Sequence, residues 1–270
     1  MRNPKKTSPR IITLLTDFGI KSGYAGCIKG VISSINPKVQ MVDITHQINP
    51  FDVWEGCFVL SEFYPYFPED TIHLVIVDPG VGGPRKALLV RTERYFFIGP
   101  DNGVLSYVFE KEKILEIKNI TREKYFIGKP SPVFHARDIF APVAAYLSLG
   151  VELGEFGPDA KECFKFKIKL PEILKDEISG EIIHIDSFGN LITNIDKNLV
   201  DTFAKKDSFD IVFKGKRIKK ISLSYFEGKR NEILALIGSS GLLELSASEG
   251  DAQKLLLAKV GDRIKLEHKG

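Results

Sequence analysis

The sequence has little cysteine and no excess of either charge. Its 270 residues include three cysteines, Cys27, Cys57 and Cys163, and no two of them form a C-x-x-C pair. We therefore expect neither a disulfide framework nor a zinc knuckle, and we interpret these cysteines as buried free thiols. The formal net charge of +3 is too small to indicate a nucleic-acid or membrane partner by itself.

The N-terminal region has no long apolar run. The run that follows the basic first ten residues, 11–15, ends at Thr16 and Asp17. A secretory signal needs about 7 to 15 apolar residues, and a membrane-spanning helix needs about 20. We therefore expect a soluble, cytoplasmic protein that has no membrane partner.

Metal and nucleotide signatures are absent as well. The five histidines show no H-E-x-x-H or similar spacing, so we predict no metal site and no cofactor. The glycine-rich segment 80–85 follows an apolar run, but its spacing is not G-x-G-x-x-G. It is either a tight turn that directs Asp78 and Arg85 into a cleft or a purely structural turn. The segment 238–241 lacks the G-x-S-x-G spacing of a nucleophilic serine, which leaves a ligand-binding turn or a simple hairpin.

Short β-rich apolar runs alternate with amphipathic stretches through the first 150 residues. The runs predict strands at 11–15, 40–44, 72–77, 88–90 and 95–98, and helices at 23–35, from Asp52 to about 63, and at 138–149. This alternation predicts an α/β domain with a central, mostly parallel sheet. Ligands bind at the carboxyl ends of the strands in such sheets, so Asp17 and Asp78, which each follow an apolar run, are candidate site residues.

The pattern of apolar runs in the sequence changes near residue 172. Beyond it, short apolar runs are separated by Gly, Asn or Asp turns, at 178–185, 191–195, 209–213, 218–223, 233–237, 242–245 and 264–266. This pattern predicts a small all-β barrel or sandwich. We therefore divide the chain into an α/β domain at 1–172 and a β-barrel domain at 173–270.

Five segments, in order along nearly the whole chain, resemble one family. They are Leu15-Thr16-Asp17-Phe18-Gly19, Val77-Asp78-Pro79-Gly80-Val81-Gly82, Phe134-His135-Ala136-Arg137-Asp138, Asp186-Ser187-Phe188-Gly189-Asn190-Leu191-Ile192-Thr193-Asn194 and Gly238-Ser239-Ser240-Gly241. Together they resemble the S-adenosyl-L-methionine (SAM) hydrolases, also called SAM hydroxide adenosyltransferases, which are related to the fluorinase and the chlorinase. The resemblance implies an N-terminal α/β domain, a C-terminal β-barrel, a homotrimer, and hydrolysis of SAM to adenosine and methionine.

The resemblance also implies roles for individual residues. The water-handling set of the family falls on Asp78, Arg85 and His135. By the same match, the substrate-binding residues and their partners are Asp17 for the ribose hydroxyls, Asn190 for the adenine with Phe188 nearby, and Asp186 and Ser239 for the methionine ammonium and backbone polar groups.

Departures from the halogenase relatives favour hydrolysis. Those enzymes carry a tyrosine at the position of Asp78, a threonine at that of Val81 and a serine at that of Ala136. A carboxylate repels a halide, and the missing hydroxyls remove its hydrogen-bond donors. Ser240 and Ile192 stand where the fluorinase carries an arginine and a tryptophan, which leaves the contact with the methionine carboxylate open.

Two other functions remain as alternatives. One is a SAM-dependent halogenase. The other is a non-catalytic protein that binds SAM or adenosine, or that binds RNA through the barrel and the basic run 214–220. That run lacks interleaved aromatic residues for base stacking, so a solvated edge strand is the better interpretation, and we expect no nucleic-acid partner.

Overall fold

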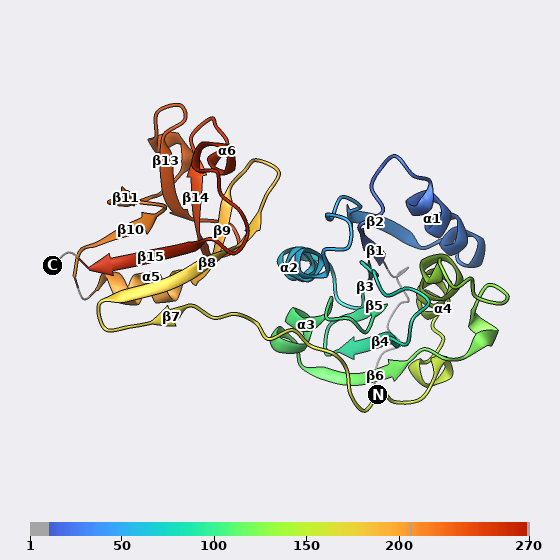
Figure 1. The fold of residues 1–270 in the computed structure, drawn as a ribbon. Helices are drawn as coiled ribbons and strands as arrows, with labels where there is room; N and C mark the ends of the chain where they lie inside the picture. The colour runs from blue at the N-terminus through green and yellow to red at the C-terminus, as the bar shows by residue number, and fades with distance from the viewer. Residues whose placement is uncertain (1–10, 206, 269–270) are drawn as a thin grey trace. The chain divides into compact units, whose positions relative to one another are not determined.

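The computed structural model describes residues 11–205 and 207–268, and the chain divides into two compact units, Met1–Lys167 and Ile168–Gly270 (Figure 1). Each unit has its own hydrophobic core. The predicted combination of an α/β domain with a β-rich, barrel-like domain is confirmed. Within the two described stretches, no helix is long and apolar enough to cross a membrane.

The first unit is built on a six-stranded sheet with the order β2-β1-β3-β5-β4-β6. The strands are β1 (Ile11–Thr16), β2 (Gln40–Thr45), β3 (Ile72–Ile76), β4 (Ala87–Thr92), β5 (Phe96–Pro100) and β6 (Ile114–Asn119). The pairs β2·β1, β1·β3 and β3·β5 are parallel, whereas β4 pairs antiparallel with both β5 and β6. The sheet is therefore mixed. The connection between β4 and β5 is too short for the crossover that a parallel pair needs.

Helices cover both faces of this sheet. They are α1 (Tyr24–Ile35), α2 (Val53–Phe63), α3 (Ser106–Lys111) and α4 (Ala141–Ser148), with short helical turns η1 (Tyr64–Tyr66), η2 (Glu123–Tyr125) and η4 (Leu153–Phe156). Ile12 and Leu14 of β1 pack on the face covered by α1 and α4, and Leu15 packs on the face of α2 and α3. Because both faces of the sheet centre are buried, the central strands β1, β3 and β5 are nearly continuous apolar runs, whereas the edge strands β2 and β6 carry polar residues and are only partly buried.

Two helices of the first unit begin at positions that can be compared with the sequence prediction. The Asp52 carboxylate accepts a hydrogen bond of 2.9 Å from the Glu55 amide and caps α2, so this helix begins at the position that the sequence predicted. The predicted helix 138–149 begins earlier, as a π-helical turn η3 (Ala136–Phe140) that leads into α4. Such turns are frequent at functional sites, and this one directly follows His135.

The second unit is a nine-stranded, nearly closed sheet with the order β11-β10-β15-β8-β9-β14-β13-β12, in which β7 also pairs with β8. Its elements are β7 (Glu172–Ile173), β8 (Glu177–Ile185), β9 (Leu191–Asp196), α5 (Lys197–Ala204), β10 (Phe209–Phe213), β11 (Lys216–Ile218), β12 (Ile221–Ser222), η5 (Tyr225–Glu227), β13 (Ile233–Ile237), β14 (Leu242–Ala247), α6 (Ala252–Leu256) and β15 (Arg263–His268).

The prediction of a single strand at 218–223 is wrong. The structure has two short strands there, β11 and β12, at opposite ends of the strand order. β11 pairs with β10, and β12 pairs with β13. The chain between them thus passes from one edge of the sheet to the other. This crossing brings the two edges together and nearly closes the barrel.

Candidate functional site

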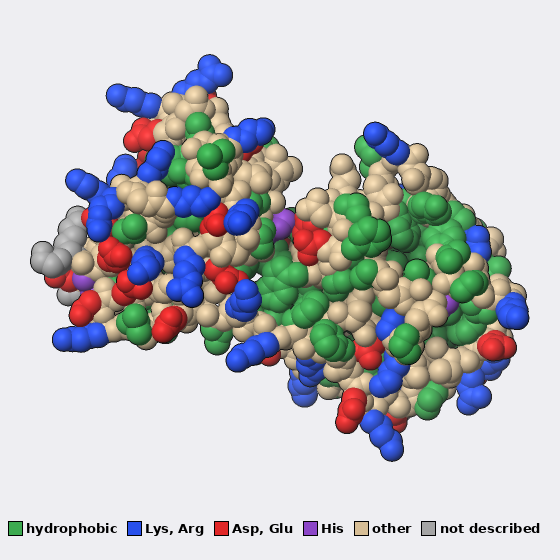
Figure 2. All heavy atoms as spheres, viewed as in Figure 1, with side chains coloured by type: hydrophobic (Ala, Val, Ile, Leu, Met, Phe, Trp, Pro, Cys, Tyr) green, Lys and Arg blue, Asp and Glu red, His purple; other side chains and the backbone are tan. Residues whose placement is uncertain are grey.

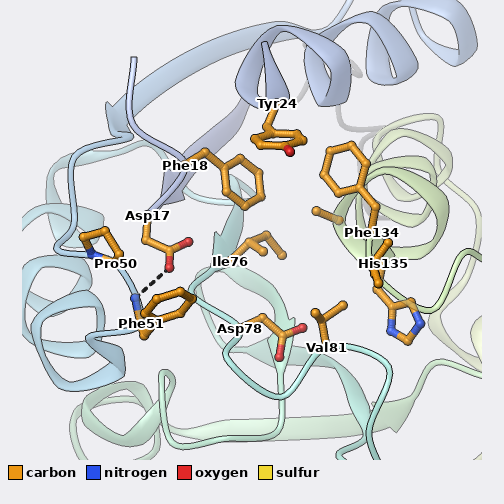
Figure 3. A pocket seen from close by; sticks show the side chains of 12 residues that line it. Asp17, Phe18, Tyr24, Pro50, Phe51, Ile76, Asp78, Val81, Phe134 and His135 are labelled. Atoms are coloured by element: carbon orange, nitrogen blue, oxygen red, sulfur yellow. Dashed lines mark hydrogen bonds between the residues drawn. The ribbon is translucent and has the colours of Figure 1, made fainter. Parts of the chain in front are cut away.

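A hollow of about 240 Å³ lies in the first unit at the carboxyl ends of β1 and β3 (Figure 3). Its ionisable lining includes Asp17, which follows β1, Asp78, which follows β3, and His135, which precedes η3. The remaining lining is mainly apolar: Phe18, Tyr24, Pro50, Phe51, Ile76, Val81, Val133, Phe134 and Ala136. The parallel strands thus place two carboxylates from distant parts of the sequence in one pocket.

The Asp78 carboxylate is held by the Arg85 guanidinium. Arg85 Nε lies 3.0 and 3.1 Å from the two carboxylate oxygens, and Nη2 lies 2.5 Å from Oδ2. The Asp78 and Arg85 side chains are only 6% and 10% exposed. A tight turn brings Arg85 back onto Asp78, and Gly82 in this turn has a φ of +77° and no room for a Cβ against the Pro132 carbonyl. This charge-assisted pair fixes the carboxylate at the edge of the hollow.

Arg85 also contacts His135. Its Nη2 donates to His135 Nδ1 over 2.9 Å, while the guanidinium lies 5.3 Å from the centre of the Phe140 ring. Because a guanidinium only donates hydrogen bonds, Nδ1 must be unprotonated, and the neutral ring carries its proton on Nε2. Burial and the Arg85 charge lower the pKa of His135, against the opposing effect of the Asp78 and Asp138 charges. His135 is therefore neutral at neutral pH.

Asp17 stands at the opposite side of the hollow from His135 in the close view (Figure 3). Its Oδ2 accepts a hydrogen bond of 2.9 Å from the Phe51 amide. This bond ties the turn after β1 to the connection between β2 and α2. Gly19, two residues on, has a φ of +67°, a conformation that favours glycine.

Three aromatic rings form one wall of the hollow. Phe18, Tyr24 and Phe134 pack edge to face, with ring centres 5.8 Å apart for Phe18 and Tyr24, 6.1 Å for Phe18 and Phe134, and 5.1 Å for Tyr24 and Phe134. Such mutual packing holds each ring in place. The hollow therefore combines a rigid apolar wall with two carboxylates, a combination that suits a ligand with both apolar and polar parts.

In the second unit, the turn between β8 and β9 is organised around Asp186. Its Oδ1 accepts from the Phe188 and Asn190 amides at 2.9 Å each, and its Oδ2 accepts from Asn190 Nδ2 at 2.9 Å. Gly189 has a φ of +81°, and a Cβ there would collide with Asp251. The turn presents Phe188, which is 75% exposed, and buries Asn190.

Ser239 lies in a different turn, between β13 and β14. The Gly241 carbonyl of that turn accepts from the Lys197 amide, beyond the end of β9, whereas the Asp186 turn precedes the start of β9. A buried carboxylate, Glu244, packs behind this turn and accepts hydrogen bonds from the Tyr225 hydroxyl at 2.6 Å and Ser246 Oγ at 3.0 Å.

Comparison with known proteins decides the family. The SAM hydroxide adenosyltransferase N-terminal domain matches residues 12–157, and the C-terminal domain of the same family matches residues 180–265. The chain belongs to the SAM hydroxide adenosyltransferase family.

Named relatives include hydrolases and, at lower coverage, halogenases. The (R)-S-adenosyl-L-methionine hydrolase of Methanocaldococcus jannaschii is 41% identical over 268 residues, which cover 95% of each chain. A fluorinase of Actinoplanes sp. is 29% identical over 212 residues, which cover 68% of this chain and 71% of that protein. The crystal structure of an uncharacterized conserved protein from Thermotoga maritima is 36% identical, has a TM-score of 0.89 and covers 96% of this chain and 100% of that one.

Within this SAM hydroxide adenosyltransferase fold, the residues indicated by the sequence fall into three groups. Asp17, Asp78 and His135 line one hollow, and Arg85 contacts two of them. Asp186, Phe188 and Asn190 share one turn of the second unit. Ser239 belongs to neither group, because its turn lies at the other end of β9.

Sequence reasoning missed two further parts of the site. The aromatic wall includes Tyr24, which no motif indicated, and Phe134, which was part of a motif but had no role. A hydrogen bond of 2.8 Å joins Thr16 Oγ1 and His46 Nδ1 beside Asp17. His46 directly follows β2, so the rule that selected Asp17 and Asp78 at strand ends could have selected His46 too.

Proposed function

We propose that the chain hydrolyses SAM to adenosine and L-methionine by in-line attack of water at the ribose C5′. The observation that carries this proposal is the Asp78 carboxylate, which Arg85 fixes at the edge of the hollow beside a neutral His135. Membership of a family with named SAM hydrolases supports the same activity. The alternative is a SAM-dependent halogenase, so the choice between the two activities rests on the nucleophile.

Hydrolysis of SAM depends more on the placement of the attacking water than on activation of the leaving group. Methionine leaves as a neutral thioether: the C5′–S bond breaks with its electron pair on sulfur, the water oxygen bonds to C5′, and one proton is released. Free water has a pKa of about 15.7 and is a poor nucleophile. Asp78 accepts a hydrogen bond from the water, and Arg85 and His135 hold the carboxylate and the water in line with the C–S bond.

The two parts of the chain divide the remaining work in this proposal. Residues 1–172 supply the water-handling set and Asp17, which binds the ribose hydroxyls. Residues 173–270 supply Asn190 for the adenine with Phe188 beside it, and Asp186 and Ser239 for the methionine ammonium and backbone polar groups. The amide of Asn190, oriented by its bond to Asp186, leaves its carbonyl oxygen available to accept a hydrogen bond from an amino group.

The residues around Asp78 favour water over a halide. Val81 and Ala136 line the hollow and offer no hydroxyl to a halide, and the Asp78 carboxylate repels it. The purified protein is incubated with SAM, with and without added chloride or fluoride, and the products are separated by chromatography. Adenosine and methionine in every sample support the proposal. A halogenated nucleoside would indicate the halogenase instead, and unchanged SAM would indicate a binding protein.

The basic run 214–220 does not favour the RNA-binding alternative. Arg217 pairs with Asp210 at 3.4 Å and with Glu267 at 3.2 Å. Lys214 pairs with Asp262 at 2.8 Å, and Lys220 with Glu227 at 3.0 Å. Carboxylates thus offset much of the charge that a phosphate backbone would need.

We further propose a homotrimer in which each site is shared between neighbouring subunits, as the family resemblance implies. Both units expose large apolar side chains, as surfaces for association do: Phe51 and Val133 at the hollow are 71% and 75% exposed, and Leu223 and Phe226 are 95% exposed each. Figure 2 shows hydrophobic side chains gathered on the visible face of the first unit, whereas Lys and Arg are prominent on the second.

Mixing two inactive variants tests the shared site. Asp78→Ala and Asn190→Ala proteins are dissociated and reassembled together, and SAM hydrolysis is measured. If neighbouring chains share sites, some mixed assemblies pair an intact first unit with an intact second unit, and activity returns. No recovery in mixed trimers that mass spectrometry has verified would contradict sharing.

The location we propose is the cytoplasm. All three cysteines are free thiols, but only Cys57 is buried as expected, since Cys27 and Cys163 are partly exposed. Burial raises the pKa of Cys57 to about 11, which keeps it protonated and unreactive. Unpaired thiols are typical of proteins in a reducing compartment.

A further inference from the structure

Two threonines on β1 each share a hydrogen bond with a buried histidine. Thr13 Oγ1 lies 2.8 Å from His73 Nδ1, and Thr16 Oγ1 lies 2.8 Å from His46 Nδ1. Both threonine side chains are buried, on the same strand. The pairs are thus alike in chemistry, distance and burial, and they differ in what surrounds them.

The Thr16 pair belongs to a directed chain of contacts. His46 Nε2 lies 3.1 Å from Asp43 Oδ1, and Asp43 Oδ2 accepts from Lys29 Nζ at 2.6 Å. The Asp43 carboxylate, 3.1 Å from Nε2, favours the tautomer that carries its proton on Nε2, in which Nδ1 accepts from the Thr16 hydroxyl. The oxygen of that hydroxyl then accepts from the Phe18 amide at 3.2 Å.

This chain ends at the turn that carries Asp17. The Phe18 amide is held through Thr16, and the Gly19 amide donates directly to the His46 carbonyl at 2.6 Å. His46 therefore holds the turn at two successive amides, one through its side chain and one through its backbone. Asp17, the residue just before them, projects into the hollow and accepts from the Phe51 amide.

The Thr13 pair lies away from the hollow. The His73 ring is stacked on Phe97 and packs edge to face with Tyr64, Tyr95 and Phe67. Burial lowers the pKa of His73 to about 3, so the ring stays neutral. Neither Thr13 nor His73 lines the hollow. The bond with Thr13 satisfies Nδ1 of this core imidazole, whose Nε2 has no hydrogen-bond partner among the described residues.

We propose that Thr16 and His46 are positioning residues that set the Asp17 carboxylate for the nucleoside, whereas the Thr13–His73 pair serves only the fold. The inference rests on the proposed function, in which Asp17 binds the ribose hydroxyls. Since Asp17 contacts a part of the substrate that does not react, its displacement weakens ground-state and transition-state binding alike. The loss therefore falls on KM and leaves kcat nearly unchanged.

Matched substitutions on β1 test this division. Thr16→Val and Thr13→Val both remove a hydroxyl at nearly constant volume, and both are expected to lower Tm to a similar extent. For Thr16→Val, we expect KM for SAM and the calorimetric Kd for adenosine to rise about tenfold, which is the effect of losing one hydrogen bond to a charged group. The kcat of this variant should stay within about twofold of the wild-type value. Thr13→Val should leave both constants at the wild-type values, and Thr16→Ser should restore them.

Each result decides the proposal. Equal KM and Kd in the two valine variants, or a Thr16→Val defect confined to kcat, would overturn it. If Thr16→Val does not fold, Asp43→Asn, at a half-exposed position, removes the charge that fixes His46 and should raise the Kd for adenosine about threefold, a part of the loss of one such bond. An unchanged Kd there would contradict the proposal. A wild-type protein that binds adenosine but forms none from SAM would instead contradict the proposed function alone.

Discussion

The two units differ in the groups that bind their main carboxylates, Asp78 and Asp186. Asp78 in the first unit is bound by a nearly buried cation, Arg85, and lies with Asp17 and His135 on one hollow. Asp186 in the second unit is bound by amides of its own turn. A carboxylate fixed by a cation beside an open pocket is placed to hold a reacting water, whereas one that shapes its own turn presents neighbouring groups for recognition.

Sheet topology explains the difference. Parallel strands end at the same edge, so the residues after β1 and β3 meet even though they are far apart in sequence. In the second unit, β9 pairs antiparallel with both β8 and β14, so the β8–β9 turn and the β13–β14 turn lie at opposite ends of β9. Asp186 and Ser239 are therefore separated along β9. The first unit therefore brings residues from distant segments into one pocket, whereas the second unit offers contacts at separate turns.

The largest expected effect comes from Asp78→Ala. We predict that SAM hydrolysis falls about 10²–10⁴-fold, the usual contribution of a group that handles the reacting proton. Binding of SAM should persist, because Asp78 acts on the water and not on the substrate. Turnover measured beside calorimetric binding separates the two. A loss of affinity as large as the loss of rate would place Asp78 among the binding residues.

Asn190→Ala tests the recognition role of the second unit. We predict that KM for SAM rises about tenfold or more, since a buried polar contact is lost, while kcat changes much less. Asn194→Ala is the matched control on β9, because Asn194 Oδ1 accepts from the Glu181 amide of the neighbouring strand β8. In steady-state kinetics, KM for SAM should rise in Asn190→Ala and stay near the wild-type value in Asn194→Ala. If Asn190→Ala lowers kcat and spares KM, the second unit takes part in the chemistry.

The pH profile probes the Arg85–His135 contact of the first unit. The pKa of His135 is lowered below its ordinary 6.5 by burial and by Arg85, so the ring is neutral above pH 6.5 and accepts from Arg85. As the pH falls through the lowered pKa, a proton on Nδ1 breaks this contact, and kcat/KM declines. We therefore expect an acid limb below pH 6.5.

His135→Gln provides the control for that profile, because its amide oxygen can still accept from Arg85 and does not titrate. The acid limb should flatten in this variant. An acid limb of the wild-type protein above pH 6.5, or one that His135→Gln leaves unchanged, would show that another group controls the rate.

The smallest expected effect is that of a chelator. The leaving thioether is neutral, so the reaction needs no electrophile on sulfur, and the histidine spacing predicted no metal site. SAM hydrolysis measured with and without EDTA should be equal. Activity that EDTA abolishes and a single divalent metal restores would require a different account of how the first unit activates water.

Local sequence signals predicted much of the fold. The continuous apolar run of β1 and the Asp52 cap of α2 were readable because their causes lie within a few residues. The division of one expected strand into β11 and β12 could not be predicted from local signals, because it depends on pairing with the distant strands β10 and β13.

The candidate site divides in the same way. The position of Asp17 and Asp78 after strands was readable, but the contact of Arg85 with His135 joins residues 50 apart and entered only through the family resemblance. The bond between Thr16 and His46 spans 30 residues and had no motif. Contacts of this kind follow from the register of β1 with β2, which the sequence pattern leaves undetermined.

Attack of water at C5′ of SAM can be followed through the fate of the water oxygen. SAM is incubated with the protein in ¹⁸O-labelled water, and the products are analysed by mass spectrometry with fragmentation. If water attacks C5′, the adenosine carries the label on its 5′ oxygen and the methionine carries none. Adenosine without label, label elsewhere in the products, or a 5′-halogenated nucleoside in its place would contradict it.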